Sequence, residues 1–167
     1  GSIVIVHLLI FLQARGLALA AAVSLGTLFG PAQVAARVIE RVFGHRYHPV
    51  WTMFAAAVLM TLGLAMLLAE RPLVAAAVIV YGAGYGVTWI ARGTLPLALF
   101  GPERYAVLIG RLALPSLLAQ ALSPFAGALM IERFGAFATV AALAALAGAN
   151  TALVAFLWTF AVRRPRA

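Results

Sequence analysis

The chain has 167 residues, of which 65% are hydrophobic and only 10% are charged, and its mean hydropathy is +1.08. This composition excludes an ordinary soluble domain, which needs far more polar side chains to cover its surface. The net charge of +8 comes from arginines that stand at the ends of apolar segments, a pattern of membrane orientation and not of nucleic-acid binding. The chain has no cysteine, so it forms no disulfide or thiolate metal site.

Long uncharged stretches separate the charged residues along the chain. They cover residues 16–36, 47–69, 72–91, 112–131 and 134–162. Each reaches the length of about 20 residues that crosses a bilayer as an α-helix. The alternating ten-residue strands of a membrane barrel do not appear. The sequence therefore predicts an all-α integral membrane protein.

The predicted helices begin with a short opening segment. It covers residues 3–14 and is followed by spans at 17–42, 49–69, 72–100, 105–131 and 136–162. Residues 1–14 would rise only about 21 Å as a helix, which is too short to span. We therefore expect the chain to start partway through a helix of a longer protein. His7 in this segment is either a proton carrier or solute ligand, or a hydrogen-bonding partner of a neighbouring helix.

The next two spans differ in character. Span 17–42 contains Pro31, which removes a backbone hydrogen bond and crowds the preceding turn, so we expect a kink there. Span 49–69 is the plainest, because only Thr52 and Thr61 interrupt its apolar residues. It is predicted to be a packing helix that faces lipid.

A basic segment follows span 17–42. Arg37 and Arg41 lie one helical turn apart, and Glu40 stands where it can pair with either of them. Gly44 is a plausible helix stop before Arg46.

Span 72–100 carries an arginine inside an apolar helix. At 100° per residue, Tyr81, Tyr85, Thr88 and Arg92 share one face. An ionisable group at that depth is costly, so it faces a partner or a water-filled cavity. Two roles of Arg92 stay open: contact with a solute or a gate, and a structural role in which it bonds carbonyls or reaches the headgroups.

A second strip of the same span is smooth. Gly82, Gly86 and Gly93 fall about a quarter turn from the polar face. Small residues at a helix surface let another helix approach closely in the membrane. We expect a neighbouring helix to pack there.

Span 105–131 combines prolines with a polar face. Pro115 and Pro124 interrupt it, and one face holds Ser116, Gln120, Ser123 and Gly127. These side chains are predicted to look toward one neighbour or one cavity. Arg111 lies on the opposite side, where it reaches headgroups and not a solute. The last span, 136–162, is alanine-rich with Asn150 and Thr151 as its mid-membrane polar pair.

The distribution of arginines predicts the orientation. One side of the predicted membrane holds Arg37, Arg41, Arg46, Arg104, Arg111, Arg163, Arg164 and Arg166, and the other holds Arg15, Arg71 and Arg133. By the excess of positive charge on cytoplasmic loops, the first side and the C-terminus are predicted to be cytoplasmic. The aromatic residues Tyr47, Trp51, Tyr105 and Trp158 fall at that same interface.

The sequence holds none of the usual catalytic patterns. It lacks a zinc-type cluster, a phosphate-binding glycine loop, a close pair of acids, and a serine with a histidine and an acid at interpretable spacing. We therefore expect no enzymatic activity, no metal and no cofactor. Polar faces on long helices that prolines and glycines interrupt are typical of a solute path with moving walls.

Three segments together resemble the C-terminal half of a major facilitator superfamily transporter. They are GPAQVAARVIERVFGHR (Gly30–Arg46), ARGTLPLALFG (Ala91–Gly101) and GRLALPSLLAQALSPFAGALMIERFG (Gly110–Gly135). The first is similar to the family's basic loop motif, with Glu40, Arg41, Gly44 and Arg46 at the acidic, basic, glycine and basic positions. The resemblance covers nearly all of residues 1–167. These residues would correspond to the second part of the family's helix seven and to its helices eight to twelve.

The resemblance implies a six-helix half-bundle, its first helix incomplete, that moves a small solute by alternating access against an N-terminal half. The opening segment and spans 17–42, 72–100 and 105–131 would line the cavity, and the other two spans would face lipid. Arg37, Glu40, Arg41 and Arg46 would form inter-helix pairs that latch one conformation, although they could equally be simple anchors on the positive side. We expect the protein in a cell membrane, with a bacterial inner membrane as the setting.

The cavity residues expected from these patterns are Arg92, Tyr81, Tyr85, Thr88, Gln120, Ser116, Ser123 and His7. A solute with an anionic group would suit Arg92. The alternative to a transporter is a non-transporting helical membrane protein: an assembly factor, a receptor-like module or an inactive fragment. Residues 1–167 by themselves are expected not to transport, because a half-bundle leaves its inner face bare.

Overall fold

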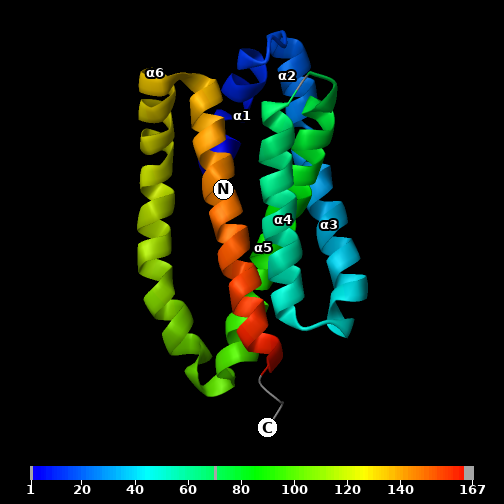
Figure 1. Cartoon of the computed structure of the whole chain (residues 1–167), viewed down its shortest axis with the longest axis vertical. Helices are drawn as coiled ribbons and strands as arrows, with labels where there is room; N and C mark the ends of the chain where they lie inside the picture. Colours follow the sequence, from blue (N-terminus) through cyan, green and yellow to red (C-terminus); the bar gives the residue numbers. More distant parts are fainter. Residues whose placement is uncertain (1, 70, 164–167) are drawn as a thin grey trace.

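The computed structural model describes residues 2–69 and 71–163, and within these ranges nearly all residues are helical and none is in a strand. The main helices are α1 (Ser2–Ala14), α2 (Leu19–Gly26), α3 (Phe29–Phe43), α4 (Pro49–Leu68), α5 (Val74–Phe100) and α6 (Pro102–Arg163). Two short 3₁₀ turns, η1 (Gly44–Arg46) and η2 (Arg71–Leu73), precede α4 and α5. Most of these helices stand roughly side by side along the longest axis of the molecule (Figure 1).

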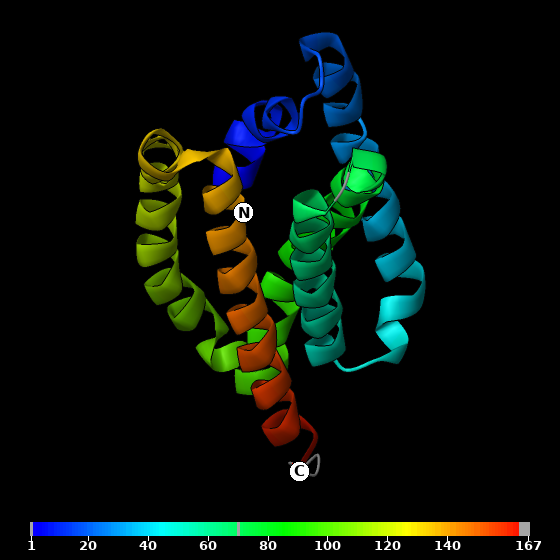
Figure 2. The same ribbon diagram turned by 45° about the horizontal axis from the view of Figure 1, so that its top comes forward.

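Helix α6 consists of two arms joined at Gly135. The backbone of Gly135 is non-helical (φ 80°, ψ 165°), and the chain reverses direction there, so that the first arm (102–134) runs up beside the second arm (136–163) (Figures 1 and 2). With this division, the helix limits agree with the predicted ranges within three residues. The turns on either side of the first arm are shorter than the predicted ranges allow, because single glycines at positive φ, Gly101 and Gly135, form them.

Replacing Gly135 by alanine is expected to destabilise the protein by about 1–3 kcal/mol, because only glycine adopts this backbone conformation without strain. The matched control is Gly110→Ala in the first arm. Gly110 is helical and a Cβ there would meet nothing within 4 Å, so this change is expected to leave stability unchanged or raise it. Unfolding of both variants in detergent, followed by circular dichroism, checks the difference. Equal stability of the two would contradict the strain at Gly135.

The predicted kink in span 17–42 is a break between α2 and α3 at Thr27 and Leu28. It lies one turn before Pro31, because proline has no N–H to donate to the carbonyl of residue 27 and its ring crowds that carbonyl. The Thr27 hydroxyl donates to the Ser24 carbonyl at 2.7 Å, next to the break.

Helix α5 packs against α3 through the glycine strip that the sequence predicts. A Cβ on Gly82 would lie 3.0 Å from the Phe29 carbonyl oxygen, and one on Gly86 would lie 2.7 Å from the Gln33 carbonyl oxygen. The two backbones are therefore nearly in contact, and the predicted close approach at these two glycines is confirmed. Gly93 takes no such part, since a Cβ there would meet only the Tyr105 hydroxyl at 3.8 Å.

The opposite side of α5 packs equally closely against α4. A Cβ on Gly84 would lie 2.8 Å from the Met60 backbone nitrogen, and one on Gly63 of α4 would lie 2.6 Å from the Tyr81 Cβ. Helix α5 is thus held between α3 and α4 by glycines on both of its sides. The sequence pattern shows the first of these two seams, and the structure adds the second.

Helix α4 packs against α5 and α6, with Ala56, Gly63 and Leu64 among its buried residues, and it leaves Trp51 and Leu62 exposed. The hydroxyls of Thr61 and Thr151 form a hydrogen bond of 2.9 Å that joins α4 to the second arm of α6. The predicted packing role is therefore confirmed, because the small residues that make this helix look featureless are the residues that permit close packing. That its exposed side faces lipid stays a prediction.

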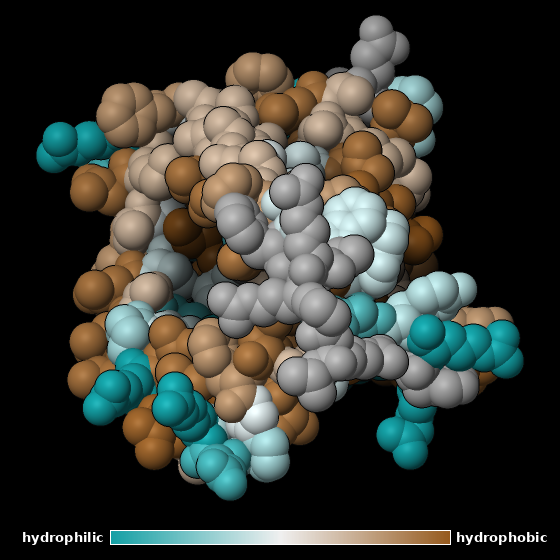
Figure 3. Space-filling model, turned by 60° about the horizontal axis from the view of Figure 1, so that its bottom comes forward, coloured by the Kyte–Doolittle hydropathy of each residue, from teal (hydrophilic) through white to brown (hydrophobic). Residues whose placement is uncertain are grey.

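Many large hydrophobic side chains are exposed on the surface. Four segments are long and apolar enough to cross a membrane: Leu19–Phe43, Pro49–Leu68, Val74–Phe100 and Pro102–Thr159, the last comprising both arms of α6. Hydrophobic residues cover most of the face drawn in Figure 3, and hydrophilic residues form separate groups near its rim. The chain therefore has the helices of a multi-pass membrane protein.

The connections lie at two opposite ends of the bundle. The α3–α4 and α5–α6 connections are at the same end as the C-terminus, and the α4–α5 connection and the turn between the two arms of α6 are at the other (Figure 1). Successive connections thus alternate between the two ends, as the assignment of arginines to two sides of the membrane assumed. Arg164 and Arg166 of that count lie outside the described residues. At the first end, the rings of Trp51 and Trp158 pack with centroids 4.1 Å apart.

Candidate functional site

A cavity of about 280 Å³ opens between α1, α4, α5 and the first arm of α6. Its lining consists of Ser2, Ile3, Met60, Tyr85, Thr88, Trp89, Arg92, Ser116, Ala119, Gln120 and Ser123. Thr88 stands near the middle of α5, about 20 Å from either end at 1.5 Å per residue. The cavity is therefore near mid-height in the bundle.

The polar faces predicted on two separate spans meet at this cavity. Six of the eight predicted cavity residues line it: Tyr85, Thr88, Arg92, Ser116, Gln120 and Ser123. On each helix these residues recur at three- and four-residue intervals, so they lie on one face. The antiparallel connection at Gly101 turns the face of α5 toward the face of α6.

Arg92 extends from α5 to α6. Its Nη2 donates a hydrogen bond to Ser116 Oγ, and its guanidinium lies over the Trp89 ring, 5.3 Å from the ring centroid. The Gln120 Nε2 donates to the Ser116 carbonyl oxygen at 3.1 Å and to Ser116 Oγ at 3.3 Å. The Ser123 hydroxyl donates to the Gln120 carbonyl oxygen at 2.8 Å. Arg92 thus bonds a side chain of the neighbouring helix, at the edge of the cavity, and not a backbone carbonyl.

The other wall of the cavity combines aromatic and sulfur-containing side chains. Tyr85 packs between Phe29 and Trp89, with ring centroids 5.8 and 6.0 Å away. The Thr88 hydroxyl is used within its own helix, donating to the Gly84 carbonyl oxygen at 2.8 Å, and it lies 3.4 Å from the Met60 sulfur. In the described ranges the Tyr85 hydroxyl and the Trp89 N–H have no hydrogen-bond partner.

Tyr81 and His7, which were also predicted to line the cavity, lie in the core instead. Tyr81 is 4% exposed and its ring stacks on Phe29 of α3, at a centroid distance of 6.2 Å. His7 is 6% exposed, and its Nδ1 lies 3.1 Å from the Ile3 carbonyl oxygen of its own helix. Its ring packs against Gly127, where an added Cβ would lie 2.9 Å from His7 Cε1. Neighbouring helices therefore cover both side chains.

The structure adds residues that the sequence patterns did not single out. Trp89 lies one turn after Tyr85 and three residues before Arg92, and this spacing would have placed it beside the polar face. Met60 comes from α4, which was expected to face lipid. The predicted span 17–42, by contrast, contributes no residue to the described lining, because α3 packs against the other side of α5.

The basic segment at the end of α3 forms two polar links between helices. The Arg37 Nε donates to the Gly86 carbonyl oxygen of α5 at 3.2 Å, and its Nη2 donates to Gln33 Oε1 at 3.3 Å. The Thr52 hydroxyl of α4 donates to Glu40 Oε1 at 2.6 Å. The expected pairing of Glu40 with Arg37 or Arg41 is absent among the described residues, because the close approach of α4 offers Glu40 a hydroxyl instead.

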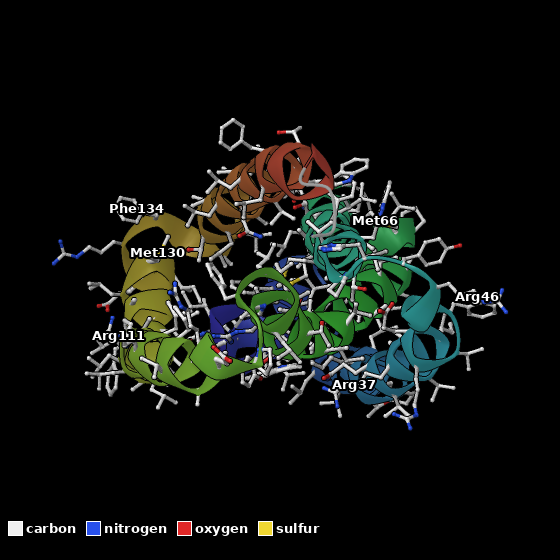
Figure 4. The ribbon with its side chains drawn as sticks, turned by 90° about the horizontal axis from the view of Figure 1, so that it is seen from below. Arg37, Arg46, Met66, Arg111, Met130 and Phe134 are labelled. Carbon is white, nitrogen blue, oxygen red and sulfur yellow. The ribbon has the colours of Figure 1, made fainter. Side chains whose placement is uncertain are left out.

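The remaining residues of the basic segment are exposed. Helix α3 ends at Phe43, next to the predicted stop Gly44, but Gly44 keeps a right-handed conformation (φ −64°, ψ −26°) and opens η1. Arg41 and Arg46 form no hydrogen bond or ion pair with other described residues. Figure 4 shows that Arg46 and Arg111 point outward at opposite edges of the molecule. The links from this segment to other helices are therefore those of Arg37 and Glu40.

Metal-binding side chains do not gather anywhere in the described ranges, where no three histidine, cysteine, aspartate or glutamate residues lie close enough to hold an ion. Comparison of the chain with protein-family models, curated proteins and solved structures finds no match.

Proposed function

We propose that the chain is the C-terminal half of a secondary transporter of the major facilitator type, which moves a small solute across a cell membrane by alternating access. The observation that supports this most is the meeting of two polar helix faces around one cavity near mid-height, with Arg92 at its edge. In lipid, polar groups around an open space are costly unless water or a solute occupies it.

Alternating access requires helices that bend and contacts that hold one state. Pro96 of α5 and Pro115 and Pro124 of α6 lie in the two helices that supply most of the cavity, and proline weakens a helix locally. We propose that the Arg37–Gly86 and Glu40–Thr52 links hold α3, α4 and α5 together while α5 and α6 bend near their prolines. We also propose that these links and the C-terminus are on the cytoplasmic side, as the distribution of arginines predicts.

The other half of the transporter would cover the exposed inner face. The first arm of α6 carries large apolar side chains that are more than half exposed: Val107, Leu112, Leu114, Leu117, Leu118, Leu122 and Phe125. Exposed apolar surface of this extent marks a surface that lipid or another protein segment covers. We propose that an N-terminal six-helix half packs there and completes the cavity.

Reconstitution tests this function. The complete protein in liposomes is expected to accumulate at least one solute from a panel of small amino acids, sugars, organic acids and amines, whereas residues 1–167 alone are expected to give no flux. A non-transporting membrane protein would give no flux in either preparation and no stabilisation by any member of the panel. That outcome would overturn the proposed function.

A further inference from the structure

We infer that the cavity selects a small organic monoanion, a single carboxylate attached to a flat apolar body. This inference rests on the proposed function and assigns the class of solute. It depends on three features of the described lining: one cation without a counter-ion, an aromatic wall beside that cation, and space for a single ring next to both.

The charge of the cavity favours an anion. Arg92 is the one residue among its eleven lining residues that carries a full charge at neutral pH, and no aspartate or glutamate accompanies it. Its bonded partner, Ser116, is neutral. A cation in a site of low dielectric gains most from an opposite charge, and a second cation in the same site is repelled. The described lining therefore disfavours amines and favours acids.

The number of cations favours a single negative charge. A phosphate monoester carries about −1.5 to −2 at neutral pH, and one guanidinium leaves part of that charge unneutralised. A carboxylate matches one guanidinium in charge and in its planar shape. Tyr85 and Trp89 also line the cavity, and a phenol hydroxyl and an indole N–H are groups that donate hydrogen bonds, as a carboxylate requires.

The wall beside Arg92 favours a flat apolar body. The Trp89 ring lies directly next to the guanidinium, and Ile3, Met60 and Ala119 continue the apolar surface. An anion bound at Arg92 therefore places the rest of its molecule against an aromatic ring and a methionine, both of which pack well on planar groups. The part of the cavity that the described residues line has a volume of about 280 Å³, which accommodates a single ring beside Arg92.

The test measures binding of four matched probes to the complete protein in detergent, by titration calorimetry: benzoate, benzamide, benzylamine and phenyl phosphate. Benzoate is expected to bind about tenfold more tightly than benzamide, which has the same shape without the charge. Benzylamine and phenyl phosphate are expected to bind more weakly than benzoate. Acetate, which has the charge without the ring, is expected to bind more weakly than benzoate, and Trp89→Leu is expected to reduce that difference.

Two arginine variants test whether Arg92 causes the preference for benzoate over benzamide. Arg92→Gln is expected to remove the preference for benzoate over benzamide, and Arg111→Gln is expected to keep it, because Arg111 points outward at the edge of the molecule. Circular dichroism of both variants checks that they fold. Tighter binding of any other probe, a preference that survives Arg92→Gln, or no binding of any probe would overturn the inference.

Flux of the same probes in liposomes separates this inference from the proposed function. Transport of benzylamine or benzamide but not benzoate would overturn the solute class and leave the transporter standing. Selective binding of benzoate with no flux of any solute would support the site and overturn the transporter.

Discussion

Arg92→Gln is expected to lower the initial rate of solute uptake by the complete protein about 100-fold or more. The guanidinium supplies the charge of the cavity and the bond to Ser116, and each hydrogen bond to a charged group contributes about 1.5–3 kcal/mol. Loss of about 2.7 kcal/mol in binding corresponds to a factor of 100. The measurement is uptake into liposomes with equal amounts of folded protein, using the solute that the reconstitution panel identifies.

Two further variants serve as controls that show whether the loss of uptake is specific to the charge of Arg92. Arg111→Gln removes an arginine that points away from the cavity and is expected to transport normally. Ser116→Ala keeps the charge of Arg92 and removes its hydroxyl partner, so its effect is expected to be smaller than that of Arg92→Gln. If Arg92→Gln transports at the rate of the unchanged protein, Arg92 has no functional role in the cavity.

The second large effect is expected at Gly86, where alanine would destabilise the protein by about 1–3 kcal/mol. The added Cβ would lie 2.7 Å from the Gln33 carbonyl oxygen and 2.9 Å from its Cα, and these are backbone atoms that move only if α3 moves. Separation of α3 from α5 would also lengthen the bond from Arg37 to the Gly86 carbonyl. Unfolding in detergent with added denaturant measures the loss.

The matched control for Gly86 is Gly30→Ala on α3. A Cβ on Gly30 would meet nothing within 4 Å, so the substitution is expected to be neutral or stabilising in the same helix pair. Gly63→Ala repeats the test at the seam between α4 and α5, where the Cβ would lie 2.6 Å from Tyr81 Cβ. Tolerance of alanine at Gly86 and Gly63 to the same degree as at Gly30 would show that the backbones are less closely packed than described.

The helices were predictable because lipid allows few alternatives. A stretch without charges and long enough to cross the bilayer satisfies its backbone only as a helix, so the limits of α4 and α5 follow from the positions of charged residues and turn glycines. Periodicity then assigns residues to faces, and this placed Arg92, Tyr85 and Thr88 together before any neighbour was known. The same rule grouped Ser116, Gln120 and Ser123.

The contacts between helices were harder to predict. Tyr81 shares the face of Tyr85, yet it is buried because Phe29 covers that turn of α5. Glu40 has arginines nearby in sequence, yet it bonds Thr52, which α4 brings close. Spacing along one helix predicts which side chains are neighbours on that helix, and it says nothing of the helix opposite.

The sequence by itself therefore determined that the chain forms apolar helices long enough to cross a membrane, roughly where these helices lie, and which side chains share a face. Only the tertiary structure decided that the faces of α5 and α6 meet around one cavity, that Trp89 and Met60 join them, and that His7 and Tyr81 do not. The physical reason is that helix formation in lipid depends on local hydrophobicity and backbone bonding, whereas the pairing of helices depends on glycines and small side chains whose partners lie far away in the chain.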